Sequence, residues 1–224
     1  MLVTFCGMVG SGKTINSKKT LRWLRAAGYE PHYLRFRFLK WRSLWRTPAP
    51  APWQEVEKKE SRATHTLAEK KITPRRLATN KTLTLRLCLG YFIRALRFKL
   101  FLRRHHRQHT IVVNRYFYDN LAHYRLATAR ERKYLRWLLA AMPKPDLAVF
   151  LVLRPETAHR RRPAYVLEEL QQLAENTITL QQLFPELKIV HTDNISTVDR
   201  QIEKHLRRVF QPRRKREHVQ ESHS

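Results

Sequence analysis

A glycine-rich loop near the start of the chain most constrains what this sequence can fold into. Residues 7–14 read GMVGSGKT and fit the phosphate-binding pattern GxxxxGK[ST]. The chain has only 5 glycines, and Gly7, Gly10 and Gly12 all fall within this segment. The apolar run before it, residues 2–6, predicts a buried strand, and residues 13–27 after it predict a helix. A strand, a glycine-rich loop and a helix in this order favour a phosphate-binding loop over an ordinary turn.

Each position of this loop has a role in the predicted chemistry. Glycine lets the backbone take left-handed angles, so that its amides can point at phosphate oxygens. The helix N-terminus adds its partial positive charge. We expect Lys13 to reach the terminal phosphates of ATP and the Thr14 hydroxyl to bind Mg²⁺. The residues predicted to bind the nucleotide are Gly7, Met8, Val9, Gly10, Ser11, Gly12, Lys13 and Thr14.

Beyond the loop, the apolar pattern predicts strands that alternate with helices. The strands are expected over residues 32–38, 110–114, 147–153 and 188–191. The helices are expected over residues 56–70, 82–104, 119–141, 164–183 and 197–210. The proline-rich residues 47–52 predict a surface loop. Together with residues 2–6, this alternation predicts one α/β domain over residues 1–210, with helices on both faces of a five-stranded sheet.

The helix expected over residues 82–104 contains the longest apolar stretch of the chain. Three cations within it, Arg94, Arg97 and Lys99, argue against a membrane span. Helical spacing places five apolar side chains on one stripe, Leu89, Phe92, Ile93, Leu96 and Leu100. We expect this stripe to pack on the core. The alternative is a basic amphipathic helix that lies on a membrane surface.

The charge of the chain predicts anionic partners without naming them. Lys and Arg number 45 against 18 Asp and Glu, which gives a formal charge of +27. Nucleotides, RNA, DNA and an acidic membrane surface all remain candidates, and charge alone favours nucleic acid. Residues 211–224 contain the run RRKR and no apolar periodicity, and they predict a disordered basic tail. The alternative for this tail is contact with nucleic acid or lipid.

The cysteines and the N-terminus bear on the compartment. Cys6 and Cys88 cannot build a disulfide framework in a chain of 224 residues, so a reducing, intracellular setting is expected. The apolar run at the N-terminus is too short for a signal peptide. These features favour a cytoplasmic protein.

Four motifs together resemble the thymidylate kinase-like kinases over residues 2–210. They are the loop at residues 7–14, NRYFYD at 114–119, LRPE at 153–156 and RRRP at 160–163. The resemblance implies a three-layer P-loop NTPase fold with a parallel sheet in the order 2-3-1-4-5. It also implies transfer of the γ-phosphoryl group of ATP to a nucleoside monophosphate or similar small acceptor. A homodimer formed through helices is a further implication, with the helix expected over residues 82–104 as the candidate.

The resemblance also implies roles for particular residues. Arg115 would contact the acceptor phosphate. A lid over about residues 154–166 would close on the phosphates through Arg160, Arg161 and Arg162. The loop over residues 192–196 would contact adenine, with Thr192 and Asn194 as candidates. Candidates for the acceptor site are Arg94, Arg115, Tyr116 and Asp119. Arginine suits phosphoryl transfer because its planar fork grips phosphate through two hydrogen bonds.

One departure from the family pattern concerns the metal. The third predicted strand ends in Asn114-Arg115, where the family usually has an Asp-Arg pair. An amide accepts hydrogen bonds from metal-bound water, but it adds no negative charge. Either Thr14 and the phosphates hold most of the magnesium, or the activity is reduced or altered. Asp119 could orient Arg115 or a substrate hydroxyl, or it could cap the helix expected to begin there.

Two other functions compete with the small-molecule kinase. The charge and the basic tail favour a kinase that acts on a polynucleotide 5′ end, or another nucleic-acid-binding P-loop protein. Asn114 favours an ATP-binding homologue with little turnover. The sequence orders these behind the small-molecule kinase.

Overall fold

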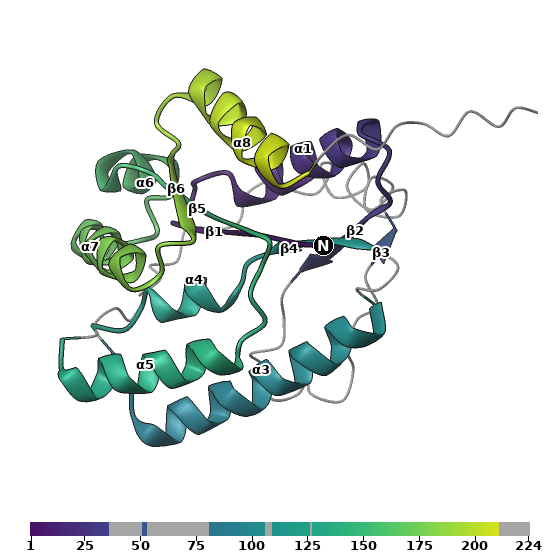
Figure 1. Ribbon diagram of the computed structural model, residues 1–224. Coiled ribbons are helices and arrows are strands. Elements are labelled where there is room, and N and C mark those ends of the chain that lie inside the picture. Colours follow the sequence, from purple (N-terminus) through teal and green to yellow (C-terminus); the bar gives the residue numbers. More distant parts are fainter. Residues whose placement is uncertain (36–50, 53–80, 106–108, 126, 211–224) are drawn as a thin grey trace, which may run out of the picture.

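The computed structural model describes residues 1–35, 51–52, 81–105, 109–125 and 127–210, and it contains a central twisted sheet (Figure 1). The strands are β1 (Leu2–Gly7), β2 (Pro31–Arg35), β3 (Ala51–Pro52), β4 (Thr110–Asn114), β5 (Leu147–Val152) and β6 (Leu187–His191). They lie in the order β3-β2-β4-β1-β5-β6. All neighbours are parallel except β2 and β3. The five parallel strands confirm the predicted order 2-3-1-4-5.

Burial explains why the central strands read as uninterrupted apolar runs. Strand β1 pairs with β4 on one side and β5 on the other, so that Val3 lies between Val112 and Leu147. Helices cover both faces, which removes the alternation of polar and apolar residues. At the edge, Pro52 pairs with His32 in the two-residue strand β3, where a missing N–H is tolerated. This edge strand belongs to the segment predicted as a surface loop, and residues 47–50 lie outside the described part.

The helices form two layers around the sheet (Figure 1). Helices α1 (Lys13–Ala26) and α8 (Ile195–Val209) cover one face. The opposite layer consists of α3 (Leu85–His105), α4 (Phe117–Leu121), α5 (Ala129–Ala141) and α7 (Leu167–Leu183). A short helix, α6 (Pro155–Arg161), follows β5 directly. The carboxyl ends of the parallel strands therefore meet at one edge, from which the segments after β1, β4, β5 and β6 emerge.

The single helix expected over residues 119–141 was wrong, because the chain forms α4 and α5 with a break between them. Thr128 starts α5 with a capping box. Its hydroxyl accepts from the Glu131 N–H at 3.1 Å, and the Glu131 carboxylate accepts from the Thr128 N–H at 3.0 Å. The helix expected over residues 164–183 begins at Leu167, and α6 was not predicted. The helix expected over residues 56–70 and the basic tail lie outside the described residues.

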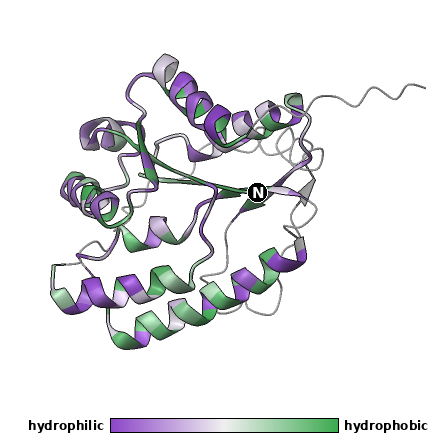
Figure 2. Cartoon of the chain, viewed as in Figure 1, coloured by the Kyte–Doolittle hydropathy of each residue, from purple (hydrophilic) through white to green (hydrophobic). Residues whose placement is uncertain are grey.

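The prediction for the face of α3 was also wrong. The five side chains predicted to face the core are 46–56% exposed, and Leu85 extends their row at 47%. The residues that pack on the core are instead Cys88, Tyr91, Ala95, Phe98 and Leu102. Apolar residues lie on both the exposed and the buried face of α3, and much of this helix is green in Figure 2. Helical spacing therefore defines a stripe but does not say which stripe points inward. The larger aromatic rings decide it, because Phe98 packs against Tyr116 and Phe117.

His123 makes the stability of this fold depend on pH. Burial, with Lys81 and Arg115 as smaller causes, lowers the pKa of His123 from 6.5 to about 4. The unfolded chain therefore binds a proton between these values before the folded chain does, so stability present above pH 6.5 is lost as pH falls toward 4. We expect His123→Gln to flatten the fall in unfolding free energy by about 1 kcal/mol per pH unit, measured by urea titration. His191→Gln at the end of β6 is the control, and equal slopes for wild type and His123→Gln would contradict the assignment.

Candidate phosphate-binding site

The segment between β1 and α1 forms a tight loop against β5. Gly7 has φ 146°, and a Cβ added there would lie 2.2 Å from the carbonyl oxygen of Leu151. The next amide, of Met8, donates to that oxygen at 3.0 Å. Gly12, at φ 80°, precedes the first residue of α1 without a side-chain cap. No side chain caps the N-terminus of α1, so the backbone N–H groups there remain available to a bound phosphate.

Lys13 points back into this loop. Its buried ammonium donates to the carbonyl oxygens of Gly7 and Met8, each at 2.7 Å. Burial lowers the pKa of Lys13, and the charge of Asp119 opposes that shift. The positive charge therefore lies inside the curve of the loop, where a phosphate bound by the amides would meet it. Ser11 donates its hydroxyl to the Met8 carbonyl at 2.8 Å and keeps the turn closed.

Asp119 bonds to the first residue of the loop. Its carboxylate accepts a hydrogen bond from the Gly7 N–H at 2.7 Å, and its other oxygen lies 3.9 Å from an Arg115 nitrogen. It caps no helix, because Tyr116 is the N-cap of α4 and Thr128 that of α5, so the capping alternative was wrong. Burial raises the pKa of Asp119, and the charge of Lys13 opposes the shift. In the sequence, Asp119 lies one helical turn beyond Arg115, and this spacing is only a weak signal that the two side chains meet.

Asn114 joins three elements at the same edge. Its amide nitrogen donates to the Thr14 hydroxyl at 3.0 Å and to the Tyr33 hydroxyl at 2.7 Å. Its carbonyl oxygen is buried and has no hydrogen-bond partner among the described residues, as is also true of the Oδ2 atom of Asp119. Tyr33 was not predicted at the site, because a tyrosine on a strand ordinarily indicates packing. Unpaired buried oxygens cost free energy unless a further group bonds to them.

Arg115 directly follows β4 in a strained conformation. It has φ 72° and is the single non-glycine residue of positive φ in the described part of the chain. Its N–H donates to the Phe5 carbonyl at 2.8 Å, which holds the bend against β1. Its side chain is 52% exposed and extends from the carboxyl edge beside the loop. Strain of this kind costs about 1–3 kcal/mol and concentrates at functional sites.

Helix α6 and its C-cap residue bring two of the three predicted lid arginines, Arg161 and Arg162, to the loop. Arg161 donates to the carbonyl oxygen of Gly10 at 3.2 Å. A Cβ added at Gly10 would lie 3.7 Å from Arg161 Cβ and 3.8 Å from Arg162 Cγ. Arg160 lies exposed on the same turn. The sequence contained a signal for this helix, because Pro155 is favoured at a first helical position.

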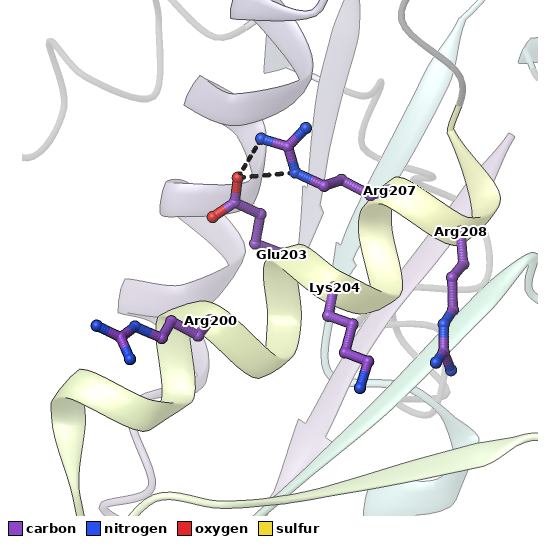
Figure 3. Close-up of a pocket in the computed structure, with 5 residues that line it drawn as sticks. All are labelled: Arg200, Glu203, Lys204, Arg207 and Arg208. Atoms are coloured by element: carbon purple, nitrogen blue, oxygen red, sulfur yellow. Dashed lines mark hydrogen bonds and ion pairs between the residues drawn. The ribbon is translucent and has the colours of Figure 1, made fainter.

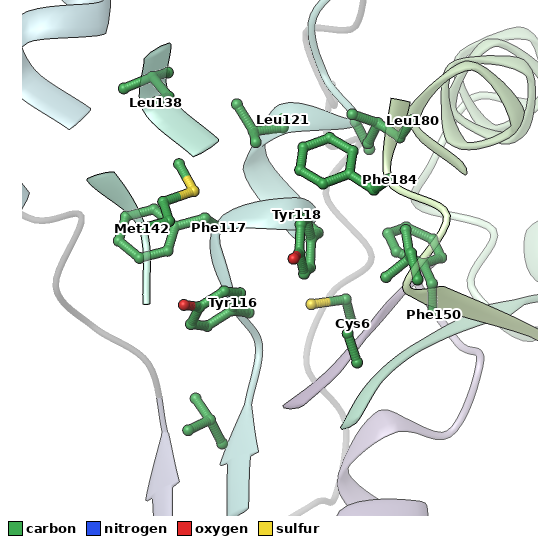
Figure 4. Packing of buried hydrophobic residues seen from close by; sticks show 14 of the residues in the cluster. Cys6, Tyr116, Phe117, Tyr118, Leu121, Leu138, Met142, Phe150, Leu180 and Phe184 are labelled. Atoms are coloured by element: carbon green, nitrogen blue, oxygen red, sulfur yellow. The ribbon is translucent and has the colours of Figure 1, made fainter. Parts of the chain in front are cut away.

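Two residues predicted to bind the phosphoryl acceptor, Tyr116 and Arg94, lie away from the loop. Tyr116 is fully buried beside Phe117 and Tyr118 (Figure 4). Its ring also packs against Phe98, and its hydroxyl donates to the Pro143 carbonyl. Because Tyr116 is 0% exposed, this structure offers none of its surface to the predicted acceptor. Arg94 lies over the Tyr91 ring, 5.6 Å from its centroid, on α3. The structure does not bring either of them to the loop.

The predicted adenine-contacting residues follow β6 at the carboxyl edge of the sheet. Thr192 donates its hydroxyl to the Val152 carbonyl at 3.0 Å, which ties the segment to β5. Asn194 caps α8 by accepting from the Ser196 N–H at 3.1 Å. Between them, Asp193 pairs with Arg154 at 3.0 Å. These contacts hold the segment at the same edge as the loop, with Asn194 exposed.

A cationic hollow lies apart from this edge (Figure 3). It is lined by Arg200, Glu203, Lys204, Arg207 and Arg208, all from α8. Glu203 pairs with Arg207 at 2.7 Å, so part of the positive charge is already neutralised. Since α8 begins beside the carboxyl edge and runs back along the sheet, this hollow is separate from the loop.

Comparisons with known proteins support the fold. The chain matches no known protein family model and no curated protein. Among solved structures it is similar to a thymidylate kinase from Ehrlichia chaffeensis, with a TM-score of 0.51 and 12% sequence identity. The match covers 92% of this chain and 98% of the other. At this identity the likeness shows the fold alone, and the chemistry depends on the residues at the loop.

Proposed function

We propose that the protein is an ATP-dependent phosphotransferase that passes the γ-phosphoryl group to a nucleoside monophosphate or a similar small acceptor. The observation that carries this proposal is the convergence of three cations on one glycine loop. Lys13 lies inside the loop, Arg161 contacts it from α6, and Arg115 leaves β4 beside it. Phosphoryl transfer spreads negative charge over the phosphoryl oxygens, so positioned cations are its main catalytic need.

Each part of the site has a place in this function. The amides of residues 9, 10, 12 and 13 bind the phosphates of ATP, because those of Gly7, Met8 and Ser11 donate within the protein. Lys13 exchanges its carbonyl partners for phosphate oxygens. Arg115 holds the acceptor phosphate, and the strained backbone fixes its direction. The lid over residues 154–166 excludes water through Arg160, Arg161 and Arg162. Residues 192–196 contact the adenine. The kinase domain then spans residues 1–210.

The residues around Thr14 fit a hydrated magnesium ion. Thr14 is exposed beside the loop. The buried Oδ1 of Asn114 and Oδ2 of Asp119, which have no hydrogen-bond partner among the described residues, can accept from metal-bound water. When bound, magnesium neutralises charge on the phosphates. The described residues contain no cluster of three or more His, Cys, Asp or Glu side chains that could hold a metal. This donor set therefore suits an ion whose remaining ligands are phosphate and water.

Thermal melting with ATP and Mg²⁺ tests nucleotide binding. We expect both together to raise the melting temperature, because a ligand that binds only the folded state stabilises it. GTP with Mg²⁺ is the comparison for the base. An unchanged melting temperature at saturating ATP would contradict the proposed site. A shift without transfer to any acceptor would favour the ATP-binding homologue with little turnover.

Asn114→Asp should lower the magnesium concentration that ATP binding requires. An aspartate at this position can accept hydrogen bonds from the hydroxyls of Thr14 and Tyr33, which now accept from the amide. It also adds the negative charge that the amide lacks. We expect the magnesium concentration for half-maximal ATP binding to fall several-fold in titrations followed by melting. Gln171→Glu, at an exposed position of α7, is the control for a generic charge change. An unchanged or weakened magnesium dependence in Asn114→Asp would contradict this account of the metal site.

A further inference from the structure

The outer face of α3 has the composition of a helix that rests on a lipid surface. Six apolar side chains occupy this face at helical spacing, Leu85, Leu89, Phe92, Ile93, Leu96 and Leu100, and we call them the α3 stripe. Each is about half exposed. A cluster of large exposed apolar side chains of this kind marks an interaction site in a folded protein.

Cations border the α3 stripe, and acidic residues are absent from the helix. The 21 residues of α3 include six Lys or Arg and no Asp or Glu. At 100° per residue, Arg86, Arg97 and Arg104 lie along one border of the stripe, and Lys99 lies at the other. Arg103 continues the stripe at its C-terminal end. Long cationic side chains beside an apolar face can reach phosphate groups while the apolar face enters the acyl region.

The position of α3 in the fold leaves this face accessible. Helix α3 lies in the outer part of its layer beside α5, and its core face is the opposite one (Figure 1). Trp137, on the neighbouring helix α5, is a further large apolar side chain at 56% exposure. No helix in the described part of the chain is long and apolar enough to cross a bilayer, so contact would occur at the surface.

We propose that the α3 stripe docks on an anionic phospholipid membrane. Charge complementarity selects this occupant. In a two-fold pairing of α3 with a second copy, the same cationic borders would face each other, and each chain carries a formal charge of +27. Nucleic acid would neutralise the cations but offers no apolar volume for six aliphatic and aromatic side chains. Anionic lipid supplies both the negative headgroups and the acyl chains.

Sedimentation with vesicles tests the proposal, using phosphatidylcholine alone and phosphatidylcholine mixed with phosphatidylserine. We expect binding to the mixed vesicles only. The double variant Phe92→Ser and Leu96→Ser should weaken it at least tenfold, because it removes apolar insertion. Ile178→Ser, an equally exposed apolar residue on α7 at 58%, is the matched control and should bind like wild type. Melting curves check that each variant folds.

A second pair of variants tests whether the cations beside the α3 stripe contribute to vesicle binding. Arg97→Gln with Arg104→Gln should weaken binding roughly 30-fold, at about 1 kcal/mol for each cation near an anionic surface. Arg200→Gln with Arg208→Gln, on α8, removes equal charge from another face and should change binding less than threefold. Equal losses for both pairs, or unaltered binding by the stripe variant, would overturn the proposal. So would absence of vesicle binding with a dimer that the stripe variant dissociates in sedimentation equilibrium. None of these measurements needs ATP, so the result is independent of the proposed transferase activity.

Discussion

Lys13→Ala is expected to lower phosphoryl transfer by at least a hundredfold, with the fold retained. The structure places the Lys13 ammonium inside the loop, where it donates to the carbonyl oxygens of Gly7 and Met8, each at 2.7 Å. Removing one preorganised donor from a developing anion commonly costs 10²–10³-fold in rate. The measurement is the initial rate of label transfer from γ-labelled ATP at saturating acceptor.

Lys19→Ala is the matched control for this effect. Lys19 lies on the same helix, but it is exposed and pairs with Asp199 at 2.7 Å. We expect its removal to change the rate less than twofold, since surface ion pairs contribute about 0–1 kcal/mol to stability. Full activity of Lys13→Ala, or equal losses for the two variants, would refute the role of the loop.

Gly7→Ala is expected to reduce the free energy of unfolding by about 3 kcal/mol or more. The added Cβ would lie 2.2 Å from the Leu151 carbonyl oxygen and 2.8 Å from its nitrogen. Both are backbone atoms of the central sheet and cannot move aside as a side chain end would. The φ of 146° adds backbone strain. Urea unfolding followed by circular dichroism measures the loss.

Gly10→Ala separates the clash from the strain. Gly10 also has a positive φ, at 79°, but the nearest atom to an added Cβ is Arg161 Cβ at 3.7 Å. We expect a loss of about 1 kcal/mol, from backbone strain alone. If both alanine variants lost the same free energy, close packing of the loop on β5 would not be what requires glycine at position 7.

The sequence was sufficient to predict the fold and the loop. The pattern GxxxxGKT is typical of one strand-loop-helix arrangement. The buried strands β1, β4 and β5 appear as apolar runs because helices cover both faces of the sheet. Strand order followed from the family resemblance. Arg161 contacts the loop and Arg115 lies beside it, because each follows a strand whose carboxyl end lies at that edge.

Other features depend on contacts that a sequence pattern does not contain. The outward face of α3 follows from which of two apolar faces has the better fitting aromatic rings, with Phe98 against Tyr116. The break between α4 and α5 follows from the capping box at Thr128. Asp119 reaches Gly7 across 112 positions of the chain, so local spacing predicted only a helix cap or a contact with Arg115 or a substrate hydroxyl.

The direct test of the central claim is transfer of label from γ-labelled ATP to a panel of acceptors in the presence of Mg²⁺. The panel comprises nucleoside monophosphates, nucleosides and 5′-hydroxyl oligonucleotides, with Lys13→Ala as the blank. We expect a labelled diphosphate product from one nucleoside monophosphate or a similar small phosphorylated acceptor. Label on the oligonucleotide alone, or on no acceptor while ATP still raises the melting temperature, would contradict the account.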